Sequence, residues 1–363
     1  MRRTVVIAPG LVGEPGGDSV LRQNLPSLQT LSELGMVCKL DAMPPLETPE
    51  ALYLGMRPSE AQMAQGPLTV SALGADPPER STHFHLSLLT LEHETVSKPA
   101  YVPTKEEERA LWEVAKRLDT RSLTLLQGEL LDHALVWEGL GDFLSWSPES
   151  GPLTLKDHLP QGDAEVALRR LIDDSVNLLG ELELNQKRLD DGLPPFNILW
   201  PWGHGRRVSV PNLALRRGEP AVVESGSLRL QGLTRLAGYS HVDRSLVGTA
   251  MKTKFSKVAQ RCLTRELTLV LIEGATNLRE LGRLEELEWF AKEMDRELLG
   301  PLLDDAIKLK SVVSVLAPSD TAALGMSSAS RSDRQLPFDE RALEEKGVAI
   351  LSLSEAVEAT VTE

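Results

Sequence analysis

Short, mostly aliphatic runs near both ends of the chain are the feature that most limits its fold. Residues 4–8 form one run, which Pro9-Gly10 closes, and residues 267–272 and 311–316 form two more. A strand that is apolar at nearly every position is buried on both faces, as is typical of parallel strands covered by helices. Helical patterns lie between these runs. The sequence therefore predicts an α/β core with a mostly parallel sheet flanked by helices.

Residues 65–185 have a different pattern. Apolar and polar side chains alternate over residues 83–91, which indicates a strand with one exposed face. The Leu-rich residues 123–137 fit two paired strands. We therefore expect an inserted α+β domain at 65–185, within a discontinuous core domain formed by residues 1–64 and 186–363.

Capping signals predict two helices in this insertion. Thr104 and Glu107 form a capping box, which predicts a helix to about Leu118. Asp163 is a plausible N-cap for a long helix through Leu184. In the core we expect helices at 28–35, 230–237 and 284–299, and strands at 36–40, 221–223 and 347–353.

The charge balance limits the partners of the chain. The formal net charge is −14 at pH 7, and a protein this acidic repels nucleic acids and anionic membranes. Lys252, Lys254 and Lys257 form a local basic cluster. Such a cluster is typical of a solvated loop, but in this acidic chain it could also face an anionic ligand.

The two cysteines, Cys38 and Cys262, stand beside aliphatic residues and form no metal-binding pattern, so we expect small buried side chains. The first apolar run is too short for a signal peptide, and no run of about eighteen apolar residues occurs. We expect a cytoplasmic protein with no membrane partner.

The stretch from Phe196 to Arg207 is the strongest candidate for a binding site. It contains two of the six tryptophans, His204 between two glycines, and the adjacent Arg206 and Arg207. Glycine lets a backbone approach a ligand closely, and paired guanidinium groups can bind a phosphate or a carboxylate. A buried aromatic turn with surface arginines is the other interpretation.

Three motifs around this stretch resemble the signature of one family. They are Asn185-Gln186-Lys187-Arg188, the segment from Gly192 to Asn197, and Trp200-Pro201-Trp202-Gly203-His204-Gly205-Arg206. These motifs are similar to those of the archaeal-type, cofactor-independent phosphoglycerate mutases of the alkaline phosphatase superfamily, which carry Gln at the position of His204. The resemblance implies an alkaline-phosphatase-like core with an inserted domain. It also implies a residual ligand pocket that comprises Asn185, Arg188, Asn197, Trp202, His204, Arg206 and Arg207.

The resemblance further implies a need for two divalent metal ions, typically manganese or zinc, which activate a serine that transfers the phosphoryl group. The matching positions of this chain hold other residues. Pro9-Gly10 stands where the family has Asp-Gly, and Thr276 (or Asn277) and Glu280 stand where it has an Asp and a His. Pro318-Ser319 stands where the family has Asp-His. The position of the last family His falls at about residue Arg331. The nucleophile position falls near Leu46-Glu47, with the hydroxyl of Thr48 nearby. No histidine follows His241.

We therefore predict a catalytically degenerate relative without a metal cofactor. Its role would be binding, assembly or regulation, with a small phosphorylated or carboxylated metabolite as ligand and a protein partner or self-association as further options. The first alternative is an active metal-dependent mutase or related phosphatase that interconverts 3-phosphoglycerate and 2-phosphoglycerate. The second is a purely structural subunit with no small ligand.

Histidines of the insertion offer a second metal hypothesis. His83 and His85 would share one face of a strand, with His93 as a third ligand. His133 and His158 each follow an Asp, like the Asp-His pair of metallophosphatases. Histidines that are satisfied in the core or exposed at the surface are the alternative interpretation.

Overall fold

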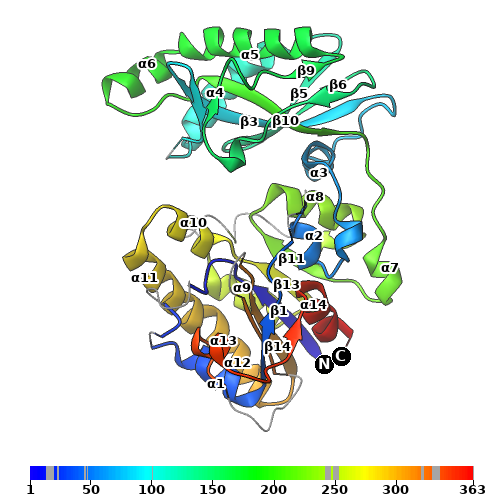
Figure 1. Ribbon diagram of the computed structural model, residues 1–363, viewed down its shortest axis with the longest axis vertical. Helices are drawn as coiled ribbons and strands as arrows, with labels where there is room; N and C mark the ends of the chain where they lie inside the picture. The colour runs from blue at the N-terminus through cyan, green and yellow to red at the C-terminus, as the bar shows by residue number, and fades with distance from the viewer. Residues whose placement is uncertain are drawn as a thin grey trace. The chain divides into compact units, whose positions relative to one another are not determined.

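The computed structural model describes residues 1–13, 20–22, 24–44, 46, 48–99, 101–241, 247, 253–319, 323–328 and 336–362. The chain divides into two compact units, both drawn in Figure 1. The core unit comprises Met1–Gln62 and Val210–Glu363, and the inserted unit comprises Met63–Ser209. The predicted domain boundary between residues 185 and 186 is therefore corrected to 209 and 210.

Strand pairing explains this correction. Strand β10 (Ile198–Gly205) runs antiparallel to β3 (Thr82–Glu92), with Ile198 opposite Leu89 and Trp202 opposite His85. The tryptophan stretch thus shares a sheet with residues that the sequence already assigned to the insertion. It belongs to the inserted unit and not to the core.

An eight-stranded sheet forms the centre of the core unit in the described part of the chain. Its order is β12 (Ser240–His241), β11 (Val222–Ser225), β13 (Leu267–Leu271), β1 (Arg2–Ile7), β14 (Ser311–Ala317), β15 (Leu324–Ser327), β2 (Met36–Leu40) and β16 (Ile350–Leu351). The first five strands pair in parallel, and β15 runs antiparallel to both of its neighbours. The mixed, mostly parallel sheet confirms the predicted α/β class.

Helices surround this sheet (Figure 1). They are α1 (Pro26–Leu34), α2 (Glu50–Tyr53), α7 (Leu213–Arg217), α8 (Leu228–Leu236), α9 (Phe255–Cys262), α10 (Gly274–Glu280), α11 (Leu284–Met294), α12 (Gly300–Ile307), α13 (Arg341–Glu344) and α14 (Leu353–Thr362), with a 3-10 turn at Pro58–Glu60. A π-helical turn, Asp295–Leu299, joins α11 to α12. The predicted helix at 284–299 therefore continues to Ile307.

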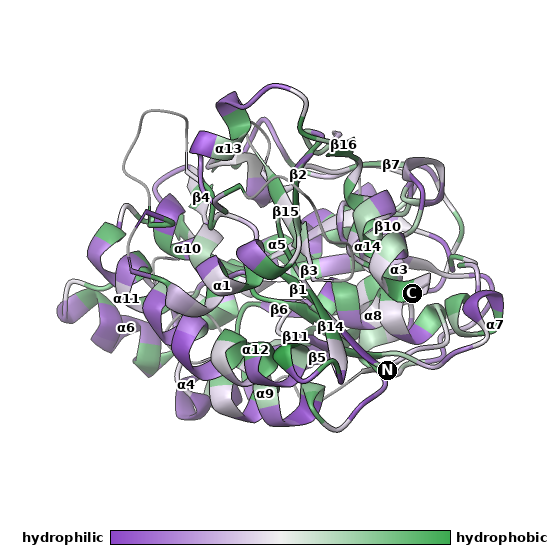
Figure 2. Cartoon of the chain, turned by 90° about the horizontal axis from the view of Figure 1, so that it is seen from below, coloured by the Kyte–Doolittle hydropathy of each residue, from purple (hydrophilic) through white to green (hydrophobic). Residues whose placement is uncertain are grey.

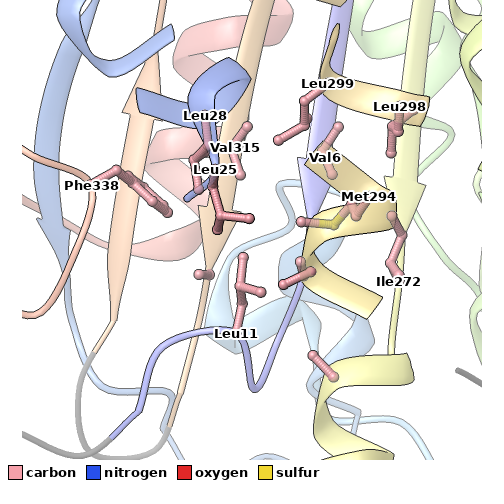
Figure 3. Packing of buried hydrophobic residues seen from close by; sticks show 14 of the residues in the cluster. Val6, Leu11, Leu25, Leu28, Ile272, Met294, Leu298, Leu299, Val315 and Phe338 are labelled. Carbon is pink, nitrogen blue, oxygen red and sulfur yellow. The ribbon is translucent and has the colours of Figure 1, made fainter. Parts of the chain in front are cut away.

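One face of the core sheet carries a large apolar cluster. Val6 of β1 lies beside Val270 of β13 and Val315 of β14, so their side chains share this face. Figure 3 shows Met294, Leu298 and Leu299 around the same strands. Figure 2 shows the hydropathy pattern that allows this packing, with green strands and helices striped in purple and green. The described helices include none that is long and apolar enough to cross a membrane.

The inserted unit is built on an antiparallel sheet. Its strands run in the order β5 (Leu123–Glu129), β6 (Asp132–Trp137), β3, β4 (Thr95–Ser97) and β8 (Leu153–Thr154), with β10 also on β3, and β7 (Phe143–Leu144) pairs with β9 (Gln161–Gly162). Its helices are α3 (Gln65–Ala72), α4 (Lys105–Ala115), α5 (Glu165–Gly180) and α6 (Glu183–Asp190), with 3-10 turns at Lys116–Leu118 and Pro148–Ser150.

Two local predictions for this unit are corrected, and one is confirmed. The capping box of Thr104 and Glu107 is present at the start of α4. Asp163 caps no helix, because its carboxylate accepts a hydrogen bond from the backbone of Asp142, at 3.0 Å. Strand β3 is buried on both faces along its first nine residues, because α3 lies against it and its polar side chains form internal hydrogen bonds.

Candidate functional site

The carboxyl ends of the parallel strands are the place where open α/β sheets bind ligands. In the core unit, β1 is followed there by the turn of Pro9 and Gly10, where Gly10 has a φ of +75°. A Cβ atom on Gly10 would lie 2.6 Å from the backbone N and Cα of Thr276 in α10. The turn therefore packs directly against the start of α10, and the contact leaves no room for a side chain at residue 10.

Arg279 of α10 holds this turn. Its Nε donates to the carbonyl oxygen of Gly10 at 2.8 Å, and one of its terminal nitrogens donates to that of Leu11 at 3.4 Å. The side chain places a positive charge beside the end of β1. The Oγ1 atom of Thr276 is buried without a hydrogen-bond partner among the described residues.

A carboxylate closes the other side of the turn. Glu340 is 2% exposed, and its Oε1 accepts a hydrogen bond from the backbone of Gly13 at 3.2 Å. Its Oε2 lies 3.6 Å from Nε of Arg22. The sequence did not identify Arg279, Glu340 or Arg22 as members of this site. The signal for Arg279 was its position one helical turn after Thr276.

The other positions named by the resemblance differ in their exposure to solvent. Thr48 and Pro318 are buried, and Glu280 is exposed. Glu47 and Arg331 lie outside the described residues. The described residues contain no group of three or more His, Cys, Asp or Glu side chains that could hold a metal ion.

In the inserted unit, the two tryptophans of β10 are buried and hydrogen bonded. Trp200 donates from its indole nitrogen to the carbonyl oxygen of Trp146 at 2.9 Å, and Trp202 donates to the hydroxyl of Ser87 at 2.9 Å. Gly203 follows with a φ of +58°, and a Cβ there would lie 2.7 Å from Cβ of Gln65. Gly203 thus permits a close approach to α3.

Asn185 and Arg188 lie together around Phe196. The amide of Asn185 donates to the carbonyl oxygens of Leu179 and Phe196 at 2.7 and 2.8 Å, and its oxygen accepts from the backbone of Phe196 at 2.8 Å. The guanidinium of Arg188 lies 4.1 Å from the centre of the Phe196 ring and donates to Glu107 at 2.9 Å. Both side chains connect α6 to the segment before β10.

The remaining candidate residues lie just before β10, at its end and just after it. Asn197 exchanges two hydrogen bonds with the backbone of Leu91, at 2.7 and 3.0 Å. His204 contacts the hydroxyl of Ser145 through Nδ1 at 3.1 Å. Arg206 and Arg207 are exposed after the strand, and Arg207 lies 3.1 Å from Asp76 in an ion pair exposed to solvent. That these seven residues bind a metabolite stays a prediction.

The histidines of β3 and β6 belong to the packed interior. His85 contacts Thr69 at 2.8 Å and Asp132 at 3.1 Å. Burial, assisted by the positive charge of Arg207, lowers the pKa of His83 to about 4. Burial likewise lowers the pKa of His133 to about 4, and its ring stacks on Trp112 with 4.7 Å between centroids. His93 is exposed.

Burial also sets the state of the two cysteines. It raises the pKa of the Cys38 thiol to about 11 and that of Cys262 to about 12. Both are buried and free, as the sequence predicted. Neither side chain is a reactive thiolate at neutral pH.

Comparisons with known proteins match nearly the whole chain. A 2,3-bisphosphoglycerate-independent phosphoglycerate mutase of Methanosarcina mazei is 22% identical, over 88% of this chain and 85% of its own. The corresponding mutase of Methanopyrus kandleri is 23% identical, over 87% and 82%, and a probable one of Geobacter sulfurreducens is 19% identical, over 93% and 90%. The chain is a distant homologue of these mutases. No protein-family model matches it.

Solved structures with similar folds agree with this homology. A Pyrococcus horikoshii protein covers 99% of this chain and 96% of its own with a TM-score of 0.71 and 17% identity. The cofactor-independent phosphoglycerate mutase of Thermoplasma acidophilum covers 100% of both chains with a TM-score of 0.59 and 18% identity. Both structures share the fold of this chain, and the second of them is a cofactor-independent mutase.

Proposed function

We propose that this mutase homologue binds a small phosphorylated or carboxylated metabolite and does not transfer its phosphoryl group. The observation that carries the proposal is the position of Arg279, whose guanidinium donates to the carbonyl oxygens of Gly10 and Leu11 at the end of β1. A fixed positive charge at this edge disfavours a divalent cation beside it.

The donor chemistry of the sheet edge supports the same conclusion. Two metal ions that clamp the oxygens of a transferring phosphoryl group need several carboxylate or imidazole ligands. Pro9 and Gly10 supply no ligating side chain, and the contact of Gly10 with Thr276 fills the space beside them. The described residues of this edge therefore do not fit two such ions.

The binding half of the proposal rests on Arg206 and Arg207. Both side chains are exposed at the end of β10, and Arg207 has an ion-pair partner, Asp76, that is itself 85% exposed. A solvent-exposed ion pair contributes little free energy, so a phosphate or carboxylate can replace Asp76 at small cost. Guanidinium groups bind such anions through two parallel hydrogen bonds.

The first test combines metal analysis with an activity assay. We expect the purified chain to contain less than stoichiometric manganese and zinc, and to show no conversion of 3-phosphoglycerate to 2-phosphoglycerate in added manganese. Stoichiometric metal with turnover that chelation abolishes would establish the alternative, an active mutase. The homology is equally consistent with that alternative, because mutases match this chain over more than four fifths of their own length.

The second test concerns binding. We expect 3-phosphoglycerate to raise the thermal unfolding midpoint, because a ligand specific for the folded state stabilises it. Arg206→Ala with Arg207→Ala should remove most of this shift. The control pair Arg121→Ala with Arg265→Ala removes the same charge from exposed positions outside the tryptophan stretch and should keep it. Equal shifts in both double variants would refute the role of Arg206 and Arg207.

A further inference from the structure

A depression of about 280 Å³ lies on the core unit between the start of α9 and the second half of α11 with the π-helical turn that follows it. The edge-to-face contact of Phe255 with Phe290, at 5.2 Å between ring centroids, joins these helices. The residues next to these two rings in the chain, Lys254 and Trp289, line the depression.

Trp289 gives the depression a flat apolar wall. Its side chain is 47% exposed, although an indole ring usually buries most of its large surface. An indole face stacks well on planar heterocycles, and such stacking tolerates different bases because each has a π-face. The wall therefore suits a ligand that contains an aromatic ring.

Lysines give the depression its unpaired positive charge. Lys254 is the N-cap residue of α9 and Lys257 lies in its first turn, so both line the depression at the start of the helix. Neither has an ion-pair partner among the described residues. Arg296 instead pairs with the two lining carboxylates, Glu293 at 2.7 Å and Glu297 at 3.0 Å. Within the described part of the chain, these two ammonium groups thus have no ion-pair partner, although the net charge is −14.

We propose that this depression binds a nucleoside phosphate, with the base stacked on Trp289 and the phosphate between Lys254 and Lys257. Ammonium groups attract phosphate as point charges, and the indole supplies the contact with the ring. The site is independent of the metabolite site at Arg206 and Arg207. It includes Lys254 and Lys257 of the basic cluster, for which the sequence left a solvated loop and an anion site open, and the third member, Lys252, lies outside the described residues.

Calorimetric titration of the full chain with adenosine monophosphate tests the proposal. We expect Lys254→Ala with Lys257→Ala, and separately Trp289→Leu, to weaken binding by about tenfold or more, which corresponds to about 1.4 kcal/mol. Lys105→Ala with Lys308→Ala removes the same charge from exposed positions outside the depression and should leave affinity unchanged. Adenosine and inorganic phosphate, used alone, should each bind more weakly than the monophosphate.

Three results would overturn the proposal. The first is no heat of binding at millimolar adenosine monophosphate, and the second is equal affinity in the depression and control variants. The third is equal affinity for inorganic phosphate, which would exclude a role for the ring. Each variant is first checked for an unchanged unfolding midpoint without ligand, so that a loss of binding is not a loss of folding.

Discussion

Asn185 makes three hydrogen bonds within the inserted unit, to the backbones of Leu179 and Phe196. It is fully buried, and its amide satisfies polar groups at the end of α5 and in the segment before β10. An asparagine in a mutase-like motif fits both a ligand contact and a structural link. Sequence alone cannot separate these roles, because both need the same pair of donor and acceptor groups.

Replacing Asn185 with Ala should lower the free energy of unfolding by about 2–4 kcal/mol, because it leaves buried backbone groups of Phe196 and Leu179 without partners. Urea unfolding followed by circular dichroism measures this. Gln186→Ala is the neighbouring control, since the side chain of Gln186 is exposed and its hydrogen bond goes to the carbonyl oxygen of Gly180. A loss of the same size in both variants would contradict the structural role of Asn185.

At the scale of elements, the aliphatic runs located the core strands because burial on both faces requires apolar residues at successive positions. Capping residues located α4 for a similarly local reason. The partner of β10 was not predictable in this way, because pairing with β3 depends on residues far apart in the chain. Arg279 was missed for the same reason, since its acceptors belong to the turn after β1.

Strand β3 and its neighbour β6 give the inserted unit a pH dependence. Folding lowers the pKa values of His83 and His133 to about 4, so both rings stay neutral where unfolded histidine, with its ordinary pKa near 6.5, binds a proton. The folded state has its full stability above the pKa of the unfolded histidine, near 6.5. This stability is lost as the pH falls toward the pKa of the folded histidine, about 4. Each histidine contributes a slope of at most about 1.4 kcal/mol per pH unit in this range.

We therefore expect the stability of the chain to decrease between pH 6.5 and pH 5, and the decrease to be smaller in His133→Phe. Phenylalanine keeps the ring stacked on Trp112 but cannot take up a proton. His93→Asn is the control, because His93 is exposed and its positive φ of 56° suits asparagine. Urea midpoints at each pH measure the slopes, and identical slopes in all three proteins would refute the account.

At the scale of the whole molecule, each unit has apolar clusters of its own. Among the described residues, a large cluster lies in the core unit, and further clusters lie within residues 63–209. A unit with its own core can fold alone. The sequence predicted an insertion but placed its end at residue 185 instead of 209. The residues of helix α6 and strand β10 contain no local pattern that shows which of the two units they belong to.

A fragment of residues 63–209 should therefore unfold cooperatively when it is expressed alone, whereas a fragment that ends at residue 185, as the sequence suggested, lacks β10 and should not. Circular dichroism and urea unfolding distinguish the two. The result would contradict the corrected boundary if both fragments showed the same cooperative transition, since β10 would then contribute nothing to the fold of this unit.

Strand β1 lies between β13 and β14 and is therefore an early part of the chain with late partners. On a ribosome, its buried face stays without a sheet until residues 267–271 and 311–317 have been made. At typical synthesis rates that wait is on the order of tens of seconds. The inserted unit completes its own strands during this interval, so the nascent chain carries a finished domain while β1 is already outside the tunnel and depends on chaperones or on transient contacts for cover.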